Sequence, residues 1–228
     1  MYLNMSKVIG MIPARMGSQR LKKKNLREIF GVSLIARAIR KCLEADVFDE
    51  VWVNSENVAF REIADAENVK FYKRPEVLGD NNTTSEQYIS DFLSNESCGY
   101  IFQVHSIAPL LTVSEIRGFV QHMLASDYDA LMSCTEIQIE CAIKGDPINF
   151  TFEEKTNSQD LDPVQRICWS ITGWRTQPFL EAYQAGKCAT YSGKVGFFPV
   201  NSMAGHVIKT EEDLAIAEAL YPMIFPSS

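Results

Sequence analysis

Short hydrophobic runs alternate along this chain with stretches in which hydrophobic residues keep helical spacing. The runs, which indicate buried strands, lie at 7–12, 50–54, 69–72, 99–104, 128–134, 166–174 and 196–200. Helical spacing occupies 33–45, 56–67, 83–93, 112–125, 177–185 and 210–220. Strands that alternate with helices at this spacing predict an α/β fold with a mostly parallel, doubly wound sheet.

Three of these helices begin at residues that suit N-terminal capping. Ser33 is placed to cap the helix over 33–45. Thr83 with Glu86 has the spacing of a capping box for the helix over 83–93, and Thr210 with Asp213 is a variant of the same motif. The capping interpretation accounts for Thr83 and Glu86 without a ligand.

The region from 136 to 162 follows neither pattern. It contains a predicted turn at 144–147 and is rich in hydrophobic residues for a loop. These residues are Ile137, Ile139, Ile143, Ile148, Phe150 and Phe152. They fit either a dimer interface or a hairpin that packs within the monomer.

Composition describes an ordinary globular protein. The chain has 228 residues and 46% hydrophobic content, enough for one substantial core. It shows no signal peptide and no apolar run of membrane-spanning length, so we expect a cytoplasmic protein without membrane partners. None of its six cysteines forms a C-x-x-C pair, which favours reduced core thiols over zinc or redox motifs.

Charge is distributed unevenly. The net charge is −7, yet residues 1–41 hold ten Lys and Arg against the single acid Glu28. A nucleic-acid-binding protein would usually be basic over a wider surface. A local cationic focus on an acidic body better suits a small, highly charged anion, so we expect no nucleic-acid partner.

The basic focus lies in the loop that follows the first predicted strand. This loop contains Gly17 and Ser18 together with Arg15, Arg20, Lys22, Lys23 and Lys24. Small residues after a strand let backbone N–H groups approach phosphate oxygens, and nearby cations neutralise them. The loop is neither a Walker A motif nor a dinucleotide-binding turn. Its local chemistry therefore leaves two interpretations open, a phosphate site and a solvated basic surface.

A longer pattern in the same loop resembles a known family. The segment Pro13-Ala14-Arg15-x-Gly17-Ser18-x-x-Leu21-x-x-Lys24-Asn25 is similar to the signature of the sugar-acid cytidylyltransferases, which make CMP-sialic acid, CMP-Kdo and relatives. The Lys24-Asn25 pair is nearer the acylneuraminate branch. The resemblance implies a Rossmann-like nucleotidyltransferase fold in one domain over 1–228, with a small dimerisation insertion within 135–190.

The resemblance also implies an activity. CMP would pass from CTP to a 2-keto-3-deoxy, sialic-acid-like sugar acid, giving a CMP-sugar for cell-surface polysaccharide synthesis and pyrophosphate. The implied enzyme is a cytoplasmic homodimer whose partners are CTP and an acidic sugar. Arg15 and Lys24 would be catalytic by neutralising the triphosphate. The backbone of Gly17 and Ser18 would cradle it, and Asn25 would fix the loop.

Later segments extend these implied assignments. Arg74, in an Arg-Pro-x-x-Leu pattern, would assist the phosphates or position the loop, and Ser85 would lie near the base. Gln103 and Arg166 would orient the sugar. His105 stands at a strand's C-terminal end, where α/β sheets bind ligands, so both a site role and a local turn role are open to it.

One departure from the family pattern concerns the metal. The family's closing motif holds Mg²⁺ with two aspartates, and this chain has Val207 and Lys209 at those positions. Mg²⁺ remains the expected cofactor, with unidentified ligands. An alternative is a CTP-binding relative with impaired catalysis. A second is an unrelated module that binds phosphosugars or nucleic acid through the basic loop.

Overall fold

A seven-stranded sheet forms the centre of the computed structural model, which describes residues 7–226. The strand order is β11-β7-β10-β6-β1-β4-β5. The strands are β1 (Val8–Ala14), β4 (Glu50–Ser55), β5 (Lys70–Lys73), β6 (Tyr100–Val104), β7 (Ala130–Ile137), β10 (Val164–Arg175) and β11 (Val195–Pro199). All neighbours pair in parallel except β10, which is antiparallel to β6 and to β7. The predicted α/β fold with a mostly parallel sheet is confirmed.

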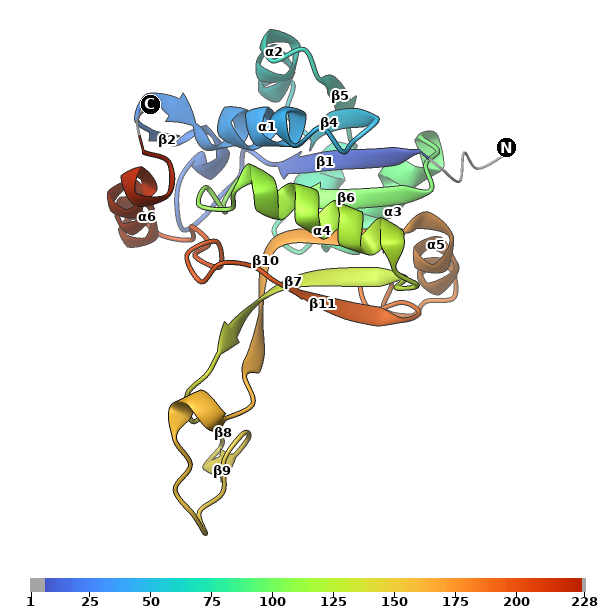
Figure 1. Ribbon diagram of the computed structural model, residues 1–228. Helices are drawn as coiled ribbons and strands as arrows, with labels where there is room; N and C mark the ends of the chain where they lie inside the picture. The colour runs from blue at the N-terminus through green and yellow to red at the C-terminus, as the bar shows by residue number, and fades with distance from the viewer. Residues whose placement is uncertain (1–6, 227–228) are drawn as a thin grey trace.

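Helices cover both faces of this sheet (Figure 1). One face carries α1 (Leu34–Ala45), α2 (Ala59–Ala66) and α4 (Val113–Ala125), whose buried side chains share a core cluster with the strands. The other face carries α3 (Ser85–Asn95) and α5 (Thr176–Gln184), which enclose a second cluster. The last helix, α6 (Glu211–Ile224), packs in a smaller third cluster with Leu21, Ile29 and Leu34. This arrangement leaves the carboxyl ends of β1, β4 and β6 at one edge of the sheet.

Short elements occupy the connections. They are β2 (Glu28–Ile29), β3 (Val32–Ser33), β8 (Ala142–Ile143), β9 (Asp146–Pro147) and the 3₁₀ turns η1 (Lys24–Leu26), η2 (Glu76–Gly79) and η3 (Ser158–Asp160). Within residues 7–226, no helix combines the length and the apolarity that a bilayer crossing needs.

The predicted helix starts are right at two of three places. The Ser33 hydroxyl accepts the N–H of Ala36, and the Thr210 hydroxyl accepts that of Asp213. The prediction for α3 is wrong by one residue, because its capping box is Thr84 with Gln87. The Thr83 hydroxyl instead donates to the carbonyl of Val77 at 3.1 Å, which keeps Thr83 in the preceding loop. Glu86 accepts the N–H of Thr190 at 2.6 Å and joins α3 to the segment before β11.

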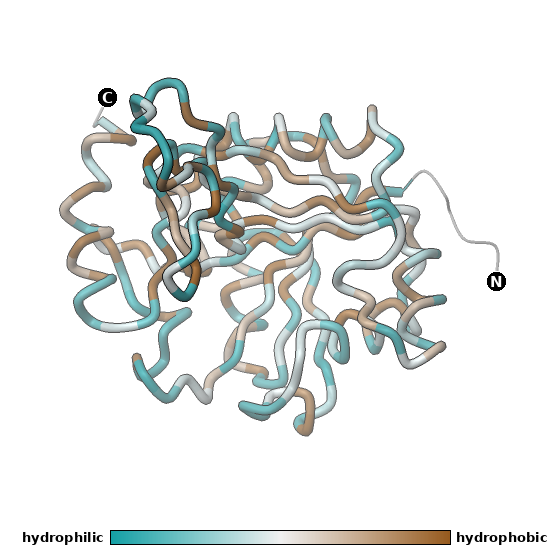
Figure 2. The backbone as a smooth tube through the Cα atoms, turned by 90° about the horizontal axis from the view of Figure 1, so that it is seen from below, coloured by the Kyte–Doolittle hydropathy of each residue, from teal (hydrophilic) through white to brown (hydrophobic). Residues whose placement is uncertain are grey.

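Residues 138–163 leave the body between β7 and β10 as a projecting arm. The arm contains the β8–β9 hairpin, which is closed by Lys144 and Gly145 at positive φ, where the turn was predicted. In Figure 2 the arm points toward the viewer, with hydrophobic segments among hydrophilic ones. Four of its hydrophobic side chains are exposed: Ile139 (57%), Ile143 (61%), Ile148 (52%) and Phe152 (75%). The projecting part is the first half of the predicted 135–190 insertion, since β10 and α5 belong to the body.

Candidate functional site

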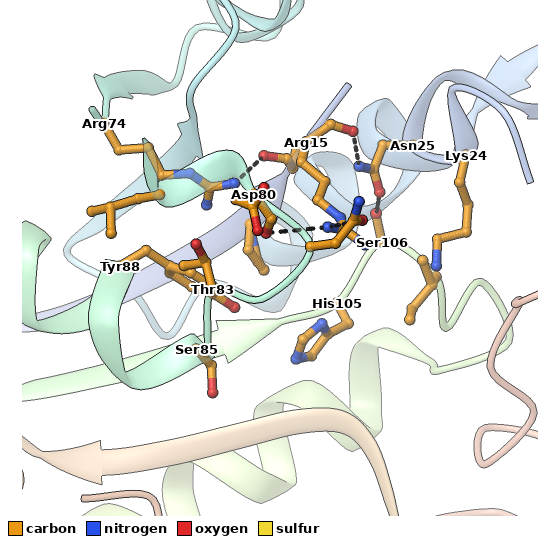
Figure 3. A pocket seen from close by; sticks show the side chains of 15 residues that line it. Arg15, Lys24, Asn25, Arg74, Asp80, Thr83, Ser85, Tyr88, His105 and Ser106 are labelled. Atoms are coloured by element: carbon orange, nitrogen blue, oxygen red, sulfur yellow. Dashed lines mark hydrogen bonds between the residues drawn. The ribbon is translucent and has the colours of Figure 1, made fainter. Parts of the chain in front are cut away.

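A cavity of about 230 Å³ opens at the carboxyl ends of β1 and β6. In α/β sheets of this kind, ligands bind at that edge, beyond the ends of parallel strands. Figure 3 shows the side chains around it. The end of β1 and its loop supply Arg15, Lys24 and Asn25, the 74–88 segment supplies Arg74, Asp80, Thr83, Ser85 and Tyr88, and the end of β6 supplies His105 and Ser106.

Asn25 fixes the basic loop against the end of β6. It is buried in the short turn η1, and its Nδ2 donates to the carbonyl oxygen of Arg15 at 3.1 Å. Its Oδ1 accepts the hydroxyl proton of Ser106 at 2.9 Å. One amide therefore joins the two ends of the basic loop and ties both to β6. This geometry agrees with the loop-fixing role assigned to Asn25 from the resemblance.

Arg74 forms the floor beneath this loop. Its guanidinium is buried, donates to the carbonyl of Ala14 at 3.0 Å and pairs with Glu56 at 3.0 Å. The second oxygen of Glu56 accepts the N–H of Met16 at 2.8 Å. Gly79 packs so closely on Glu56 that an added Cβ would lie 2.4 Å from its Cγ. Arg74 thus contacts the end of β1, and because it also lines the cavity, its assigned contact with the phosphates remains a prediction.

Arg15 reaches across the cavity mouth. Its Nη1 donates to Asn81 Oδ1 at 2.8 Å and to the carbonyl of Asp80 at 3.4 Å. Both acceptors are neutral, so they orient the guanidinium without neutralising it. A triphosphate in the cavity would meet a full positive charge here.

Lys24 is the most perturbed cation of the site. Burial, and then the nearby positive charges of Arg20, Arg15 and Lys209, lower the pKa of Lys24 to about 8, while Asp213 opposes them. Three cations therefore act on Lys24, and each destabilises its charge until an anion enters.

This perturbation predicts a pH dependence for anion binding. A bound triphosphate favours the ammonium form and raises the pKa of Lys24 above its value of about 8 in the free protein. CTP affinity should then be flat up to about pH 7.5 and fall by up to tenfold per unit as the pH rises through 8. Calorimetric titrations at several pH values test this. Lys24→Arg, which stays protonated, should flatten the profile, and an equally steep fall in that variant would contradict the assignment.

His105 lies between Lys24 and a buried hydrogen-bonded pair. Gln103 Nε2 donates to the hydroxyl of Tyr88, so Gln103 Oε1 is the acceptor for His105 Nε2–H at 3.0 Å. This assignment leaves His105 Nδ1 as a hydrogen-bond acceptor. Burial, together with the charge of Lys24, lowers the pKa of His105 to about 4, which keeps the ring neutral near pH 7. The structure places His105 in the cavity wall, and its carbonyl also accepts the N–H of Ala108 in a local turn, so both roles considered from sequence stay open.

Four residues expected at the site lie outside this cavity. Gln103 is buried behind His105 and Tyr88. Gly17 is exposed, and Ser18 lies in a shallow depression with Lys22 and Lys23, its N–H donating to the carbonyl of Met16. Arg166 stands at the base of the arm, where its guanidinium donates to Thr135 Oγ1 and to the carbonyl of Gly205. Their assigned contacts with phosphate and sugar remain predictions.

The side chains near the cavity do not fit a two-carboxylate metal site. Asp80 is the only acid among the described residues that line it, and its Oδ1 accepts the N–H of Asn82. Val207 packs partly buried against the core, and Lys209 is exposed. No group of three or more His, Cys, Asp or Glu side chains within 7–226 is arranged to hold a metal ion. Mg²⁺ therefore stays an expectation from the resemblance, and its ligands are not identified among residues 7–226.

Several residues of the site were not predicted from the sequence. Tyr88 follows Ser85 by three residues on α3, and that helical spacing could have placed both on the cavity side. Ser106 follows His105 at the end of β6 and shares the positional signal that singled out His105. Glu56 and Asn81 gave no signal, because their partners Arg74 and Arg15 are distant in the chain.

Comparisons with known proteins agree with this geometry. A family model described as cytidylyltransferase matches residues 9–213. The chain is 27% identical over 223 residues to a pseudaminic acid cytidylyltransferase of Campylobacter jejuni, covering 92% of this chain and 94% of that protein. It is 27% identical over 168 residues to an N-acylneuraminate cytidylyltransferase of Streptococcus agalactiae, covering 69% of this chain and 41% of that one. The chain spans less than half the length of the N-acylneuraminate relatives that it matches.

A solved structure of a CMP:2-keto-3-deoxy-manno-octonic acid synthetase complexed with CTP superposes with a TM-score of 0.68 and 16% identity, covering 96% of this chain and 99% of that chain. At that identity the superposition establishes the shared fold. The family model, by contrast, spans nearly the whole sheet together with the basic loop and the start of α6. The chain therefore belongs to the cytidylyltransferase family.

Proposed function

We propose that this protein transfers CMP from CTP to a nine-carbon 2-keto-3-deoxy sugar acid and releases pyrophosphate. The observation that carries the proposal is the convergence of Arg15, Lys24 and Asn25 on one cavity at the carboxyl ends of β1 and β6. Coverage of 94% of the pseudaminic acid relative supports a nine-carbon acceptor of that class. The carboxylate of such a sugar acid suits a site surrounded by cations.

In the proposed reaction, the anomeric hydroxyl of the sugar attacks the α-phosphorus of CTP. The new P–O bond forms as the bond to the bridging oxygen of pyrophosphate breaks, and the hydroxyl proton passes to solvent. Arg15 and Lys24 stabilise the negative charge that moves onto pyrophosphate. His105 Nδ1, held as an acceptor by Gln103, orients a hydroxyl at the cavity wall. We assign no step to a metal ion.

A second candidate is a CTP-binding relative with impaired catalysis. It is favoured by the single carboxylate lining the cavity, Asp80, and by Val207 and Lys209 at the family's metal positions. Both candidates require a nucleotide pocket. Thermal-shift measurements with CTP, UTP, ATP and GTP, each with and without Mg²⁺, test that requirement. Preferential stabilisation by CTP is expected, and equal shifts with all four would overturn both.

We further propose that the arm joins two copies of the chain. Light scattering should give about twice the 25.7 kDa chain mass, because the exposed hydrophobic residues of the arm would be buried between subunits. Phe152→Asp should shift the protein toward monomer. Val58→Asp, at a similarly exposed hydrophobic residue before α2, should leave the mass unchanged. A monomer at every concentration would mean that the arm is a self-supported hairpin.

A further inference from the structure

A second, larger cavity lies away from the proposed catalytic site, between α1, the start of α4 and the end of α6. Its volume is about 640 Å³, and it shares no lining residue with the cavity at β1 and β6. Four cations line it: Arg37, Arg40 and Lys41 from α1, and Arg117 from α4. Within residues 7–226, Glu44 is the only acid that lines this cavity.

Three of these cations have neutral hydrogen-bond partners among the described residues. Arg37 donates to the carbonyl of Ile29 and the hydroxyl of Tyr221. Arg117 donates to the carbonyls of Ala45 and Glu44 at 3.0 and 3.1 Å. Carbonyl and hydroxyl oxygens satisfy the donors, but they leave the net charge in place. Arg40 differs, because it is paired with Glu67 at 2.7 Å.

Lys41 carries the most buried of these charges. Its side chain lies in the cavity wall with 7% of the residue exposed, and its ammonium donates to the carbonyls of Pro109 and Leu111. Burial, and then the charge of Arg37, lower the pKa of Lys41 to about 7. The contact with Pro109 and Leu111 also ties this cavity to the segment that supplies His105 and Ser106.

Two further features favour an anion here. The first turn of the thirteen-residue helix α4 lines the cavity through Thr112, Val113 and Ser114, so the positive end of its dipole adds to the charge of the cations. In addition, Arg37 Nε is buried and has no hydrogen-bond partner within the described residues. An unpaired donor beside three cations whose hydrogen-bond partners are neutral suits an oxygen-rich ligand.

From these observations we infer that the cavity between α1, α4 and α6 is a second anion site, which binds a small phosphorylated molecule through Arg37, Lys41 and Arg117. On a protein whose net charge is −7, such a concave positive region would concentrate multivalent anions selectively. The inference does not depend on the proposed cytidylyl transfer, since it concerns binding alone.

Calorimetric titration with inorganic pyrophosphate tests this site. The unmodified protein should bind two pyrophosphates per chain, and Lys24→Ala should retain the second. In the Lys24→Ala background, Arg37→Gln, Lys41→Gln and Arg117→Gln should each weaken that remaining binding at least tenfold. Glutamine at 41 keeps a donor for Pro109 and Leu111, which limits unfolding. The control is Arg61→Gln, whose guanidinium stacks on Phe71 outside the cavity and should leave binding unchanged.

Hydrogen exchange provides a readout that needs none of the substitutions at α1 or α4. Adding pyrophosphate to Lys24→Ala should slow exchange in the first turn of α4 and the last turn of α6. Loss of all pyrophosphate binding in Lys24→Ala, or remaining binding that resists all three glutamine substitutions, would overturn the inference. If only the proposed function is wrong, no CMP transfer will be observed, but the second pyrophosphate will still bind.

Discussion

Replacing Lys24 with alanine should weaken CTP binding by about 1.5–3 kcal/mol, the usual loss for a charge-assisted contact. Arg15→Ala should have an effect of similar size. Both cations line the cavity, and neither is neutralised by an acidic hydrogen-bond partner among the described residues. Burial makes Lys24 the more informative of the two, since its charge is already destabilised in the free protein.

Lys22→Ala is the matched control for this prediction. Lys22 belongs to the same run of lysines but is exposed and lies outside the cavity. Its loss should change CTP affinity by a few tenths of a kcal/mol at most, as for a screened surface charge. Calorimetric titration of the three variants decides the matter. Equal, small effects would mean that the basic loop is a solvated surface and not a phosphate site.

Lys209→Ala should reduce CTP affinity measured without metal by roughly tenfold, the effect of one lost cation near a triphosphate. The ammonium of Lys209 is close enough to Lys24 to lower its pKa, so it belongs to the same cationic cluster. It stands where the resemblance expects a metal-binding carboxylate. We therefore propose that Lys209 supplies positive charge in place of a divalent ion, and that Mg²⁺ adds little to CTP binding by the unmodified protein.

The reverse substitution gives the complementary test. Val207→Asp combined with Lys209→Asp should create or strengthen Mg²⁺-dependent CTP binding, because two carboxylates offer the oxygen ligands that Mg²⁺ prefers. Since a single ammonium cannot clamp two phosphates as a divalent ion does, slow transfer is expected of the unmodified protein. Strong Mg²⁺-dependent transfer that Lys209→Ala leaves unaffected would refute the proposal that Lys209 replaces the metal ion. It would mean that other carboxylates of the protein hold Mg²⁺.

The sequence was most informative where hydrophobic spacing decides structure. Strands and helices were predicted because their buried faces repeat in the chain, as Ile35, Ala38 and Ile39 do on α1. The direction of β10 was not predictable, since its hydrophobic pattern is the same for either orientation. The start of α3 moved by one residue because adjacent threonines offered two possible caps, and the Val77 carbonyl engages Thr83.

For the site, the sequence identified the residues that are close together in the chain. Arg15, Lys24 and Asn25 share one loop, and a motif could join them. Gln103 shares a face of β6 with His105, because side chains two residues apart point the same way, and it lies buried behind His105. Its expected contact with the sugar remains a prediction. Contacts such as those of Arg74 with Glu56 and Arg15 with Asn81 depend on loops meeting across the sheet edge, which no local pattern records.

The central claim, cytidylyl transfer to a 2-keto sugar acid, is tested most directly by product formation. Purified protein would be incubated with CTP and, separately, with pseudaminic acid, N-acetylneuraminic acid and 2-keto-3-deoxy-manno-octonic acid, and pyrophosphate and CMP-sugar would be quantified. We predict equimolar pyrophosphate and CMP-sugar with a nine-carbon acid, no product when UTP or ATP replaces CTP, and loss of product in Lys24→Ala. If CTP binds but no acid yields a CMP-sugar, the result would contradict the claim. It would favour the alternative, a CTP-binding relative with impaired catalysis.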